Sequence, residues 1–584
     1  MKKRIVYGVL LLFCILFGLT GCSDSESTYK EENAESVPTE VYLAESEEED
    51  IQTLSFIHVE KEVLLDEEGR QFRIKGMCFG NNVWANLSEP TLTHHDKDSY
   101  EELEELGFNT VRFYMNYRLF EEDENPYVYK ESGFEWLDKN IEWAREHNIR
   151  LILNMHVPQG GFLSASNVQF WKEEENIKRY MALWCEIAKR YSDEPVILGY
   201  GVMNEPFVPK MATEEESLNL YYELIEELMS EVRKIDDKHI FFVERPYGIV
   251  DEHNTVNYAW GDVGSFRVLS DKNVVYEFHF YENTSFTSQG ISWANFERDW
   301  YYEDDSIALL SGNRLYFAVC KEKSITDYDA AQGGWQYLES PIYDLADYPE
   351  ANAAYFLLYY SELAKDTTVL MDDIVVKEYD AQNNWIRDIY QYSFDSSTAC
   401  SGWDLSEGTG GKCAYTDVDG HNAAGCEMIT DAGGNYQLYK NDSLYNYFPI
   451  TKGNKYQVGL WIKVKGKEDI KVEPGMQLVS VDNVYALNRD FLENKLLTYV
   501  NIGKEKQVPV YIGEYGTTSH IMGNEFGGEK WVSDVMDIFN EYSLNYSYHD
   551  YHEENYGFYT TPATQERNAL NEDLYQVFAD KVKN

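Results

Sequence analysis

Basic residues are scarce in this sequence. Its 584 residues include 50 Lys and Arg against 102 Asp and Glu, which gives a formal net charge of −52. Such an excess of negative charge repels nucleic-acid phosphates and anionic membrane surfaces, so we expect neither as a partner. We interpret the acidity as that of a soluble extracellular surface.

The sequence also lacks the short motifs of metal centres. Its eight Cys and twelve His form no C-x-x-C pair and no H-E-x-x-H, so we expect no metal and no cofactor. Cys78, in a strand-like run, and Cys185, in a helical run, are expected to be buried. The last four cysteines allow one or two disulfides outside the cell, with the pairing left open: Cys320, Cys400, Cys413 and Cys426.

The first 22 residues have the features of a leader. A basic start over residues 1–4 precedes an apolar run over 5–19 that is short for a membrane span. The tetrapeptide that ends at Cys22, LTGC, resembles a bacterial lipobox, which implies a lipid on that thiol and a cell-surface location. The alternative is a signal-anchor helix with ordinary cysteines. Residues 23–53, rich in Glu, Ser and Asp, are expected to form a disordered acidic linker.

From residue 54 onward, short apolar runs alternate with amphipathic helical stretches. This pattern is typical of βα units around a parallel sheet. Eight runs predict strands, which begin near Phe72, Asn109, Arg150, Val196, His239, Asn273, Val508 and Leu544. Eight such units close into an α/β fold, the (β/α)8 or TIM barrel. The segment 56–72 predicts a hairpin that plugs the bottom of this barrel.

One connection is far too long for a barrel. About 220 residues separate the sixth and seventh predicted strands, where a barrel needs roughly 30. Between them, frequent Gly, Asp and Asn turns and alternating apolar runs indicate β structure. We therefore predict a barrel over 54–289 and 483–584, with an all-β, jelly-roll-like sandwich over 290–482 inserted between strands six and seven.

Two glutamates stand where a barrel carries its chemistry, at the carboxyl ends of strands. Glu205 follows the fourth predicted strand in VILGYGVMNEP, and Glu514 closes the seventh in VPVYIGEYG. Asn-Glu-Pro alone is more often a polar turn. A pair of carboxylates across one cleft is what glycosidic cleavage needs, since one protonates the departing oxygen while the other attacks or activates water.

Several motifs in order resemble glycoside hydrolase family 5, a family of retaining (β/α)8 enzymes. The matching positions are Arg112 in NTVRFYM, His156 in LILNMHVPQGG, Asn204 and Glu205, His279 and Tyr281 in EFHFY, and Glu514 in YIGEYG. The resemblance implies that Glu205 is the acid/base, that Glu514 is the nucleophile and that the other residues bind substrate. It also implies carboxyl groups about 5–5.5 Å apart.

The side chains suit these roles. Glu514 must stay ionised, and Arg112 with the Tyr281 hydroxyl would favour that state. We expect Glu205 to start protonated in a drier setting near His279. Asn204 is suited to bind a sugar 2-hydroxyl, a contact that strengthens in the transition state.

The chain departs from the family on strand eight. Where the family has a tryptophan beneath the sugar, this sequence reads YSYHDY, so His549 or Tyr548 takes its place. His549 either selects a different sugar or weakens stacking there, or it is a polar group of the barrel rim. Trp84 and Trp171 are the favoured stacking aromatics. Other candidates are Tyr114, Tyr117 and Trp260.

The inserted region resembles a carbohydrate-binding module in the runs YSFDSSTACSGWDL and NKYQVGLWIKVKG. Its candidate stacking residues are Trp335, Trp403 and Tyr439, and the alternative is a sandwich that only braces the cleft. We predict a monomeric, surface-anchored hydrolase of β-linked polysaccharide, endo-β-1,4-glucanase-like. Alternatives are a β-mannanase or another glycan hydrolase of the family, or an inactive polysaccharide-binding lipoprotein.

Overall fold

The computed structural model describes residues 54–583, except 86, 255, 259–265, 293–298, 321–325, 395–402, 407–411, 422–423, 430–433, 441–446 and 466–469. The expected leader, Cys22 and the expected linker lie outside these residues. Within the described part of the chain, no helix is both long and apolar enough to cross a membrane.

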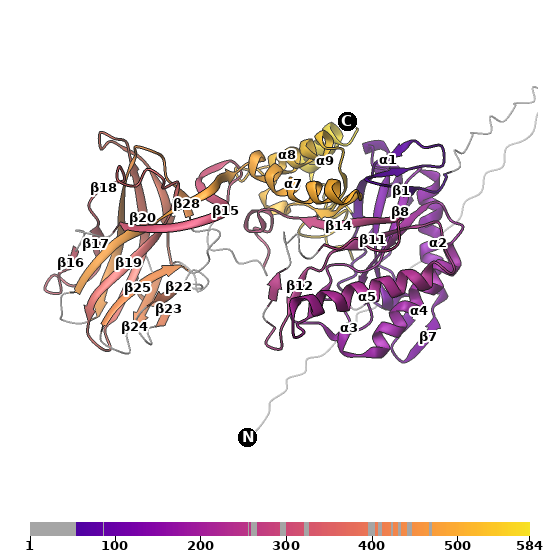
Figure 1. Cartoon of the computed structure of the whole chain (residues 1–584), viewed down its shortest axis with the longest axis horizontal. Coiled ribbons are helices and arrows are strands. Elements are labelled where there is room, and N and C mark those ends of the chain that lie inside the picture. Colours follow the sequence, from indigo (N-terminus) through magenta and orange to yellow (C-terminus); the bar gives the residue numbers. More distant parts are fainter. Residues whose placement is uncertain are drawn as a thin grey trace, which may run out of the picture. The chain divides into compact units, whose positions relative to one another are not determined.

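A closed barrel of eight parallel strands forms the larger part of the described chain (Figure 1). All eight strands fall where the sequence predicts them, so the (β/α)8 prediction is confirmed. In chain order, which is also the order around the barrel, they are β4 (Lys75–Phe79), β5 (Thr110–Asn116), β8 (Arg150–Val157), β9 (Ile197–Gly201), β11 (Ile240–Glu244), β14 (Val274–Phe280), β29 (Val510–Tyr515) and β30 (Asn545–Tyr548).

Helices follow the barrel strands, and the longer ones are amphipathic and bury one face. They are α1 (Lys97–Leu106), α2 (Glu131–Glu146), α3 (Gln169–Lys172), α4 (Glu174–Tyr191), α5 (Glu214–Val232), α6 (Thr284–Thr287), α7 (Arg489–Lys506), α8 (Gly528–Glu541) and α9 (Glu572–Lys581). Gly107 ends α1 with a φ of 95°, in the left-handed region that favours glycine, as the sequence indicates. Asp96 and Ser99 form a capping box at the start of this helix.

The amino-terminal segment closes the lower end of the barrel. Strands β1 (His58–Glu60), β2 (Val63–Leu65) and β3 (Gln71–Phe72) form a small antiparallel sheet. Ile57 and Leu64 from this segment belong to one buried cluster with barrel residues such as Ile152 and Ile240. The apolar plug leaves the opposite end, at the carboxyl ends of the strands, for polar chemistry.

The described residues between β14 and α7 form two seven-stranded sheets that share a buried core. One sheet holds β15 (Asp304–Cys320), β16 (Thr326–Tyr328), β19 (Ala353–Leu363), β22 (Trp403–Ser406), β25 (Gly434–Lys440), β26 (Tyr447–Pro449) and β28 (Ile470–Leu487). The other holds β17 (Gln336–Glu339), β18 (Tyr343–Asp344), β20 (Thr368–Tyr379), β21 (Trp385–Tyr392), β23 (Lys412–His421), β24 (Ala424–Ile429) and β27 (Lys455–Lys465). Two apolar faces packed together explain the alternating pattern of these strands.

Some expectations for this inserted region need correction. Trp403 is buried against Phe356, Tyr392 and Phe394, so it is a core residue and not a platform for sugar. Cys426 in β24 is buried. Cys78 in β4 is a buried free thiol, and Cys185 in α4 is a free thiol that is only partly buried. The side chains of Tyr439, Cys320 and Cys413, and all of Cys400, lie outside the described residues.

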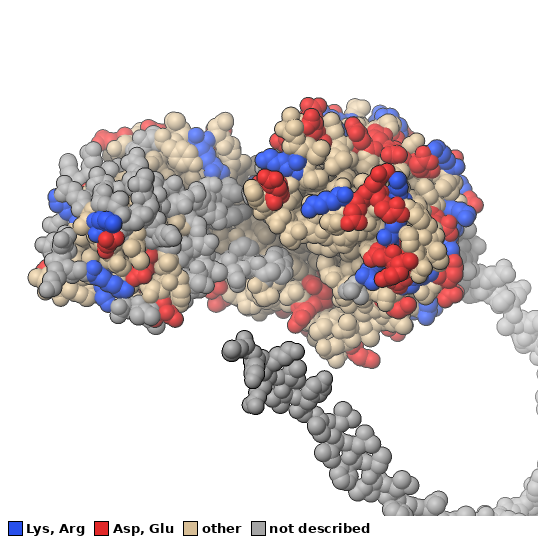
Figure 2. Space-filling model, turned by 90° about the horizontal axis from the view of Figure 1, so that it is seen from below, with Lys and Arg blue, Asp and Glu red and all other residues tan. Residues whose placement is uncertain are grey.

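Acidic and basic side chains are mixed on the surface. Figure 2 shows Asp and Glu spread over the coloured face of the barrel with Lys and Arg between them. The described residues of this face form no single large basic patch, in keeping with the net charge of −52.

Candidate active site

Strand β9 and the residues after it aim Glu205 into the carboxyl end of the barrel. The Asn204 backbone N–H donates to the Met155 carbonyl of β8 at 3.1 Å, which continues the ladder beyond the strand. Glu205 then takes a φ of 37°, a left-handed conformation that is costly outside glycine. Its backbone N–H donates to Glu244 Oε2 at 2.7 Å. This bond holds the strained turn that presents the Glu205 carboxyl.

A bulge in β29 presents Glu514. Phe278 pairs with Ile512 and His279 with Glu514, so the ladder skips Gly513. A Cβ at Gly513 would lie 1.8 Å from Glu277 Oε1, which explains why glycine stands there.

Three donors converge on the Glu514 carboxylate. Its Oε1 accepts from Arg112 Nη1 at 2.7 Å and from the Tyr114 hydroxyl at 2.6 Å. Its Oε2 accepts from the Tyr281 hydroxyl at 3.0 Å. Because all three groups donate, they stabilise the ionised carboxylate. Oε2 accepts one of these hydrogen bonds and Oε1 accepts two, so Oε2 is the oxygen with more lone-pair electrons available for attack.

His279 joins the two predicted catalytic glutamates. Its Nδ1 lies 3.0 Å from Glu205 Oε1 and 3.6 Å from Glu514 Oε2. Since both distances end on one atom, these two oxygens lie less than about 7 Å apart, which accommodates the ~5–5.5 Å separation of carboxyl groups in retaining enzymes. Both carboxyls therefore serve one cleft.

The electrostatics separate the protonation states of these groups. Burial raises the pKa of Glu514, but the positive charges of His279 and Arg112 outweigh burial and hold the pKa well below its usual range. Burial likewise lowers the pKa of His279, and the neighbouring carboxyls Glu244, Glu514 and Glu205 raise it well above its usual range. Glu514 is therefore ionised and His279 is an imidazolium at neutral pH.

Arg112 is the fixed cation of the site and is fully buried. Besides Glu514, its guanidinium reaches Asn204 Oδ1 at 2.9 Å and Glu277 Oε1 at 2.8 Å. Because Asn204 accepts with its oxygen, its Nδ2 group is oriented to donate to substrate. The position predicted for a 2-hydroxyl contact is thus fixed by the same arginine that holds Glu514.

The sequence analysis missed two residues of the site, Glu244 and Glu277, and gave a third, Tyr114, a different role. Glu244 ends β11 and Glu277 lies within β14, and each exposes only 3% of its surface. The sequence feature that could have revealed them is an acidic residue within an apolar run, as in HIFFVE. Tyr114 was expected to line the cleft, but its hydroxyl contacts Glu514; it stands two positions after Arg112, on the same side of β5.

The predicted sugar-binding histidines line one side of the cleft. The ring of His156 stacks on Tyr114 at 4.0 Å, and burial lowers the pKa of His156 well below its usual range. His549 Nδ1 lies 3.1 Å from the Tyr114 hydroxyl, and burial lowers the pKa of His549 as well. Tyr548 is fully buried against Tyr515, so of the two strand-eight candidates only His549 faces the site.

The two favoured tryptophans differ. Trp84 is 43% exposed, and its ring contacts Tyr114, His156 and His549. Trp171 packs on Phe170 and donates its indole N–H to the Phe207 carbonyl, and no ring contact joins it to those cleft residues. The contact of Trp171 with substrate therefore stays a prediction. Trp260 lies outside the described residues.

Two groups of possible metal ligands occur in the described residues. Glu205, Glu244 and His279 have ligand atoms within 4.8 Å of one another, as do Asp372, Asp373 and His421. In the first group Glu244 accepts from the Glu205 backbone and His279 faces Glu205, so hydrogen bonds within the protein explain the arrangement. Nothing in its geometry requires an ion.

Comparisons with known proteins concern the barrel. Residues 65–318 match the family model described as Cellulase (glycosyl hydrolase family 5). The chain is 28% identical to Endoglucanase C of Acetivibrio thermocellus over 196 residues, 33% of this chain and 52% of that protein. It is 24% identical to Cellodextrinase A of Ruminococcus flavefaciens over 227 residues, 38% and 62% of the two chains. The chain thus spans about half the length of the first of these curated relatives.

One solved structure matches the chain at low identity. Endoglucanase Cel5A from Thermotoga maritima is 14% identical, with 86% of this chain and 96% of that chain covered and a TM-score of 0.43. The family match covers the segment that carries Arg112, Glu205 and His279. Over residues 65–318, the barrel of this chain is therefore similar to glycoside hydrolase family 5.

Proposed function

We propose that this chain is a retaining glycoside hydrolase that cleaves β-linked polysaccharide by double displacement and acts as an endo-β-1,4-glucanase. The observation that carries the proposal is the convergence of Glu205 and Glu514 on His279, with Arg112, Tyr114 and Tyr281 donating to Glu514. Endoglucanase C and Cellodextrinase A among the relatives support a β-glucan substrate.

The first step forms a covalent intermediate. Glu514 Oε2 attacks the anomeric carbon, and the glycosidic C–O bond breaks as Glu205 gives its proton to the departing oxygen. The His279 Nδ1–H donates to Glu205 Oε1, which leaves Oε2 as the oxygen that carries the transferable proton. Asn204 stabilises the developing charge through the sugar 2-hydroxyl.

The second step releases the product. Glu205, now ionised, takes a proton from water as the water oxygen attacks the same carbon and the bond to Glu514 breaks. Two inversions give net retention. The donors on Glu514 Oε1 stabilise the carboxylate as it departs.

The N-terminal residues suggest where the enzyme acts. The lipobox-like LTGC that ends at Cys22 supports a lipid-anchored protein on the outer side of a membrane. A Cys22→Ala variant that stays membrane-bound in detergent partitioning would argue against this anchor.

Product analysis tests the proposed reaction. Incubation of residues 23–584 with β-1,4-glucan, mixed-linkage glucan, xyloglucan and β-mannan should release oligosaccharides, most from β-1,4-glucan, with the β configuration at the new reducing end. A mannan preference would correct the substrate alone. Release of no product, with retained polysaccharide binding, would identify a binding protein, and an initial α product would refute retention.

A further inference from the structure

The Tyr114 hydroxyl lies between the nucleophile and a histidine. Its oxygen is 2.6 Å from Glu514 Oε1 and 3.1 Å from His549 Nδ1. A phenol has one proton to donate. Burial raises the pKa of Glu514, but neighbouring positive charges outweigh burial and keep this carboxyl ionised, so it can only accept. The Tyr114 proton therefore lies on the side of Glu514, and the Tyr114 oxygen accepts from His549.

This arrangement fixes the position of the proton on His549. Burial lowers the pKa of His549, so its ring is neutral at neutral pH and carries a single N–H. Because the Tyr114 proton is directed at Glu514, the donor in the contact between His549 and Tyr114 must be Nδ1–H. The three groups thus form one chain of hydrogen bonds, from Nδ1–H through the hydroxyl to Oε1, in which each bond polarises the next.

The barrel holds both ends of this chain in place. The His549 backbone N–H donates at 2.9 Å to the carbonyl of Tyr515, the residue that follows the nucleophile on β29. A Cβ at Gly516 would lie 2.5 Å from the His549 carbonyl oxygen, which explains why glycine stands there. The Tyr114 ring stacks on His156 at 4.0 Å and lies nearly parallel to the His549 ring, at 11°. These contacts fix the donor and the acceptor relative to each other.

The chain of hydrogen bonds matters most in the second step of the proposed reaction. In the glycosyl-enzyme, Glu514 is an ester, and its carbonyl oxygen is a weaker acceptor than a carboxylate. An acceptor at the position of Nδ1 would then compete for the Tyr114 proton. Because Nδ1 carries a proton of its own, Tyr114 continues to donate to Oε1. The donor is thus already in place when negative charge returns to this oxygen.

We propose that His549 is a positioning residue that acts through Tyr114. Its Nδ1–H keeps the Tyr114 hydroxyl donating to Glu514 Oε1 in both the free enzyme and the glycosyl-enzyme. This bond makes Glu514 the better leaving group when water attacks the sugar. The inference rests on the proposed function and gives His549 a role other than the direct contact with sugar that its place on strand eight indicates.

Other titratable groups also face Glu514, and the test must separate their effects from that of His549. They are Cys78 on β4, Arg112 on β5, His156 on β8, Glu205 after β9, and His279 and Tyr281 on and after β14. Glu553 faces His549 itself. A double variant isolates the pathway, because an effect of His549 that passes through Tyr114 disappears once Tyr114 is changed.

The first measurement is the pH dependence of kcat/KM on an aryl β-glycoside. Its acid limb, where activity falls as pH decreases, reports ionisation of the nucleophile in the free enzyme. Tyr114→Phe removes a donor to the carboxylate, so this limb should move up by about 1–2 pH units. His549→Leu should move it up by about 0.3–1 unit. His549→Asn has a similar shape to Leu but can supply the N–H, so it should lie closer to wild type than Leu does.

Two further proteins complete this measurement. In the Tyr114→Phe background, His549→Leu should cause no additional shift of the acid limb. Tyr575→Phe removes a hydroxyl from a tyrosine that is exposed on α9, and this matched control should follow the wild-type profile.

The second measurement is turnover of a dinitrophenyl β-glycoside, whose leaving group departs without protonation, so that release of the sugar limits kcat. His549→Leu should lower kcat about 2- to 10-fold, and KM should fall with it because the glycosyl-enzyme accumulates. A histidine that contacted the sugar directly would instead raise KM when it is removed.

The outcomes separate the two proposals. An additional shift in the double variant, or an Asn variant that behaves as Leu does, would overturn the role of His549 as a residue that acts through Tyr114. A higher KM for His549→Leu with no shift of the acid limb would identify a sugar contact instead. Either result would leave the hydrolase assignment in place. If wild type cleaves no aryl glycoside and no polysaccharide, the proposed function itself fails.

Discussion

Glu244 provides a sharp test of how Glu205 is positioned. The site holds four carboxyls and two cations, Arg112 and the His279 imidazolium. Glu277 and Glu514 are paired with Arg112 at 2.8 and 2.7 Å. Burial raises the pKa of Glu244 well above its usual range, and its Oε2 accepts the backbone N–H of Glu205. Glu244 therefore favours its protonated form while the charge of Glu514 keeps His279 an imidazolium, and Glu244 Oε2 holds the Glu205 turn.

Two substitutions at Glu244 follow from this assignment. Gln is neutral and offers the same acceptor, so Glu244→Gln should keep kcat/KM within about threefold. Glu244→Ala leaves the Glu205 N–H buried without a partner, which costs about 1–3 kcal/mol. This cost falls on the Glu205 turn, with its φ of 37°, which the transition state needs. We therefore expect kcat/KM to fall about 5- to 150-fold.

The leaving group shows whether the effect passes through Glu205. A dinitrophenolate leaves without protonation, so kcat/KM for a dinitrophenyl glycoside should be nearly equal in Glu244→Ala and wild type. An unactivated oligosaccharide should show the full loss. The reasoning is refuted if Gln costs as much as Ala, which would require an ionised Glu244, or if the loss is the same for both leaving groups.

Three further predictions concern other parts of the barrel. Glu514→Gly should abolish hydrolysis, and added azide should restore turnover with an α-glycosyl azide as product; full activity without azide would end its assignment as nucleophile. Gly513→Ala should drive a methyl group against Glu277, displace that side chain from Arg112 and lower kcat/KM about tenfold or more, with a smaller loss in thermal stability. Burial lowers the pKa of His95 to about 3, below its unfolded value near 6.5, so its contribution to stability is present above pH 6.5 and is lost as pH falls toward 3. As pH falls across this range, the free energy of unfolding in urea should decrease by up to ~1.4 kcal/mol per pH unit more for wild type than for His95→Asn. Parallel plots of unfolding free energy against pH for the two proteins would contradict this prediction.

The sequence reveals most of the barrel because each strand is a short apolar run that ends in polar residues. Glu205 and Glu514 stand out for the same reason, since a carboxyl at the end of a buried strand needs a partner. Glu277 is harder to see because it lies inside an apolar strand, and its role depends on Arg112, which the barrel brings across from β5. Only closure of the barrel makes that pair.

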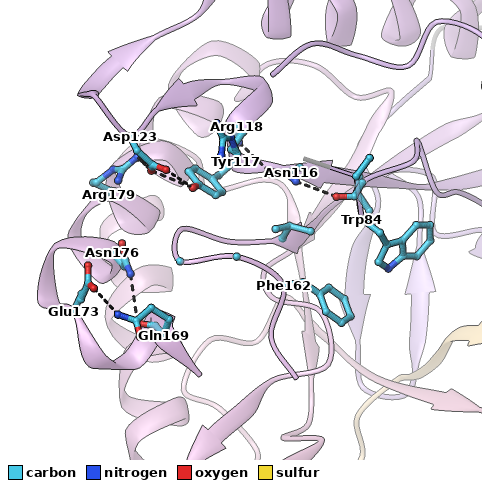
Figure 3. A pocket seen from close by; sticks show the side chains of 15 residues that line it. Trp84, Asn116, Tyr117, Arg118, Asp123, Phe162, Gln169, Glu173, Asn176 and Arg179 are labelled. Atoms are coloured by element: carbon cyan, nitrogen blue, oxygen red, sulfur yellow. Dashed lines mark hydrogen bonds and ion pairs between the residues drawn. The ribbon is translucent and has the colours of Figure 1, made fainter. Parts of the chain in front are cut away.

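In the inserted region, much less of the structure could be predicted from the sequence. Its alternating runs predict strands, but pairing between distant segments decides which face is buried. Trp403 looked like a platform for sugar and is a core residue. A pocket of about 590 Å³ beside Trp84 (Figure 3) is also invisible in the sequence, because its lining comes from the ends of β4, β5 and β8 and the residues after them, which meet only at the barrel rim.

Labelling of the nucleophile tests the proposed chemistry most directly. A 2-deoxy-2-fluoro-β-glycosyl fluoride reacts with a retaining enzyme, and its electron-withdrawing fluorine then slows release of the sugar by destabilising the oxocarbenium-like transition state. Peptide mass spectrometry should place one fluorosugar on Glu514. Glu205→Ala should still be labelled there, because fluoride departs without an acid, and Glu514→Ala should not. A label on Glu205, Glu244 or Glu277, or persistent labelling of Glu514→Ala, would contradict the assignment of the two carboxyls.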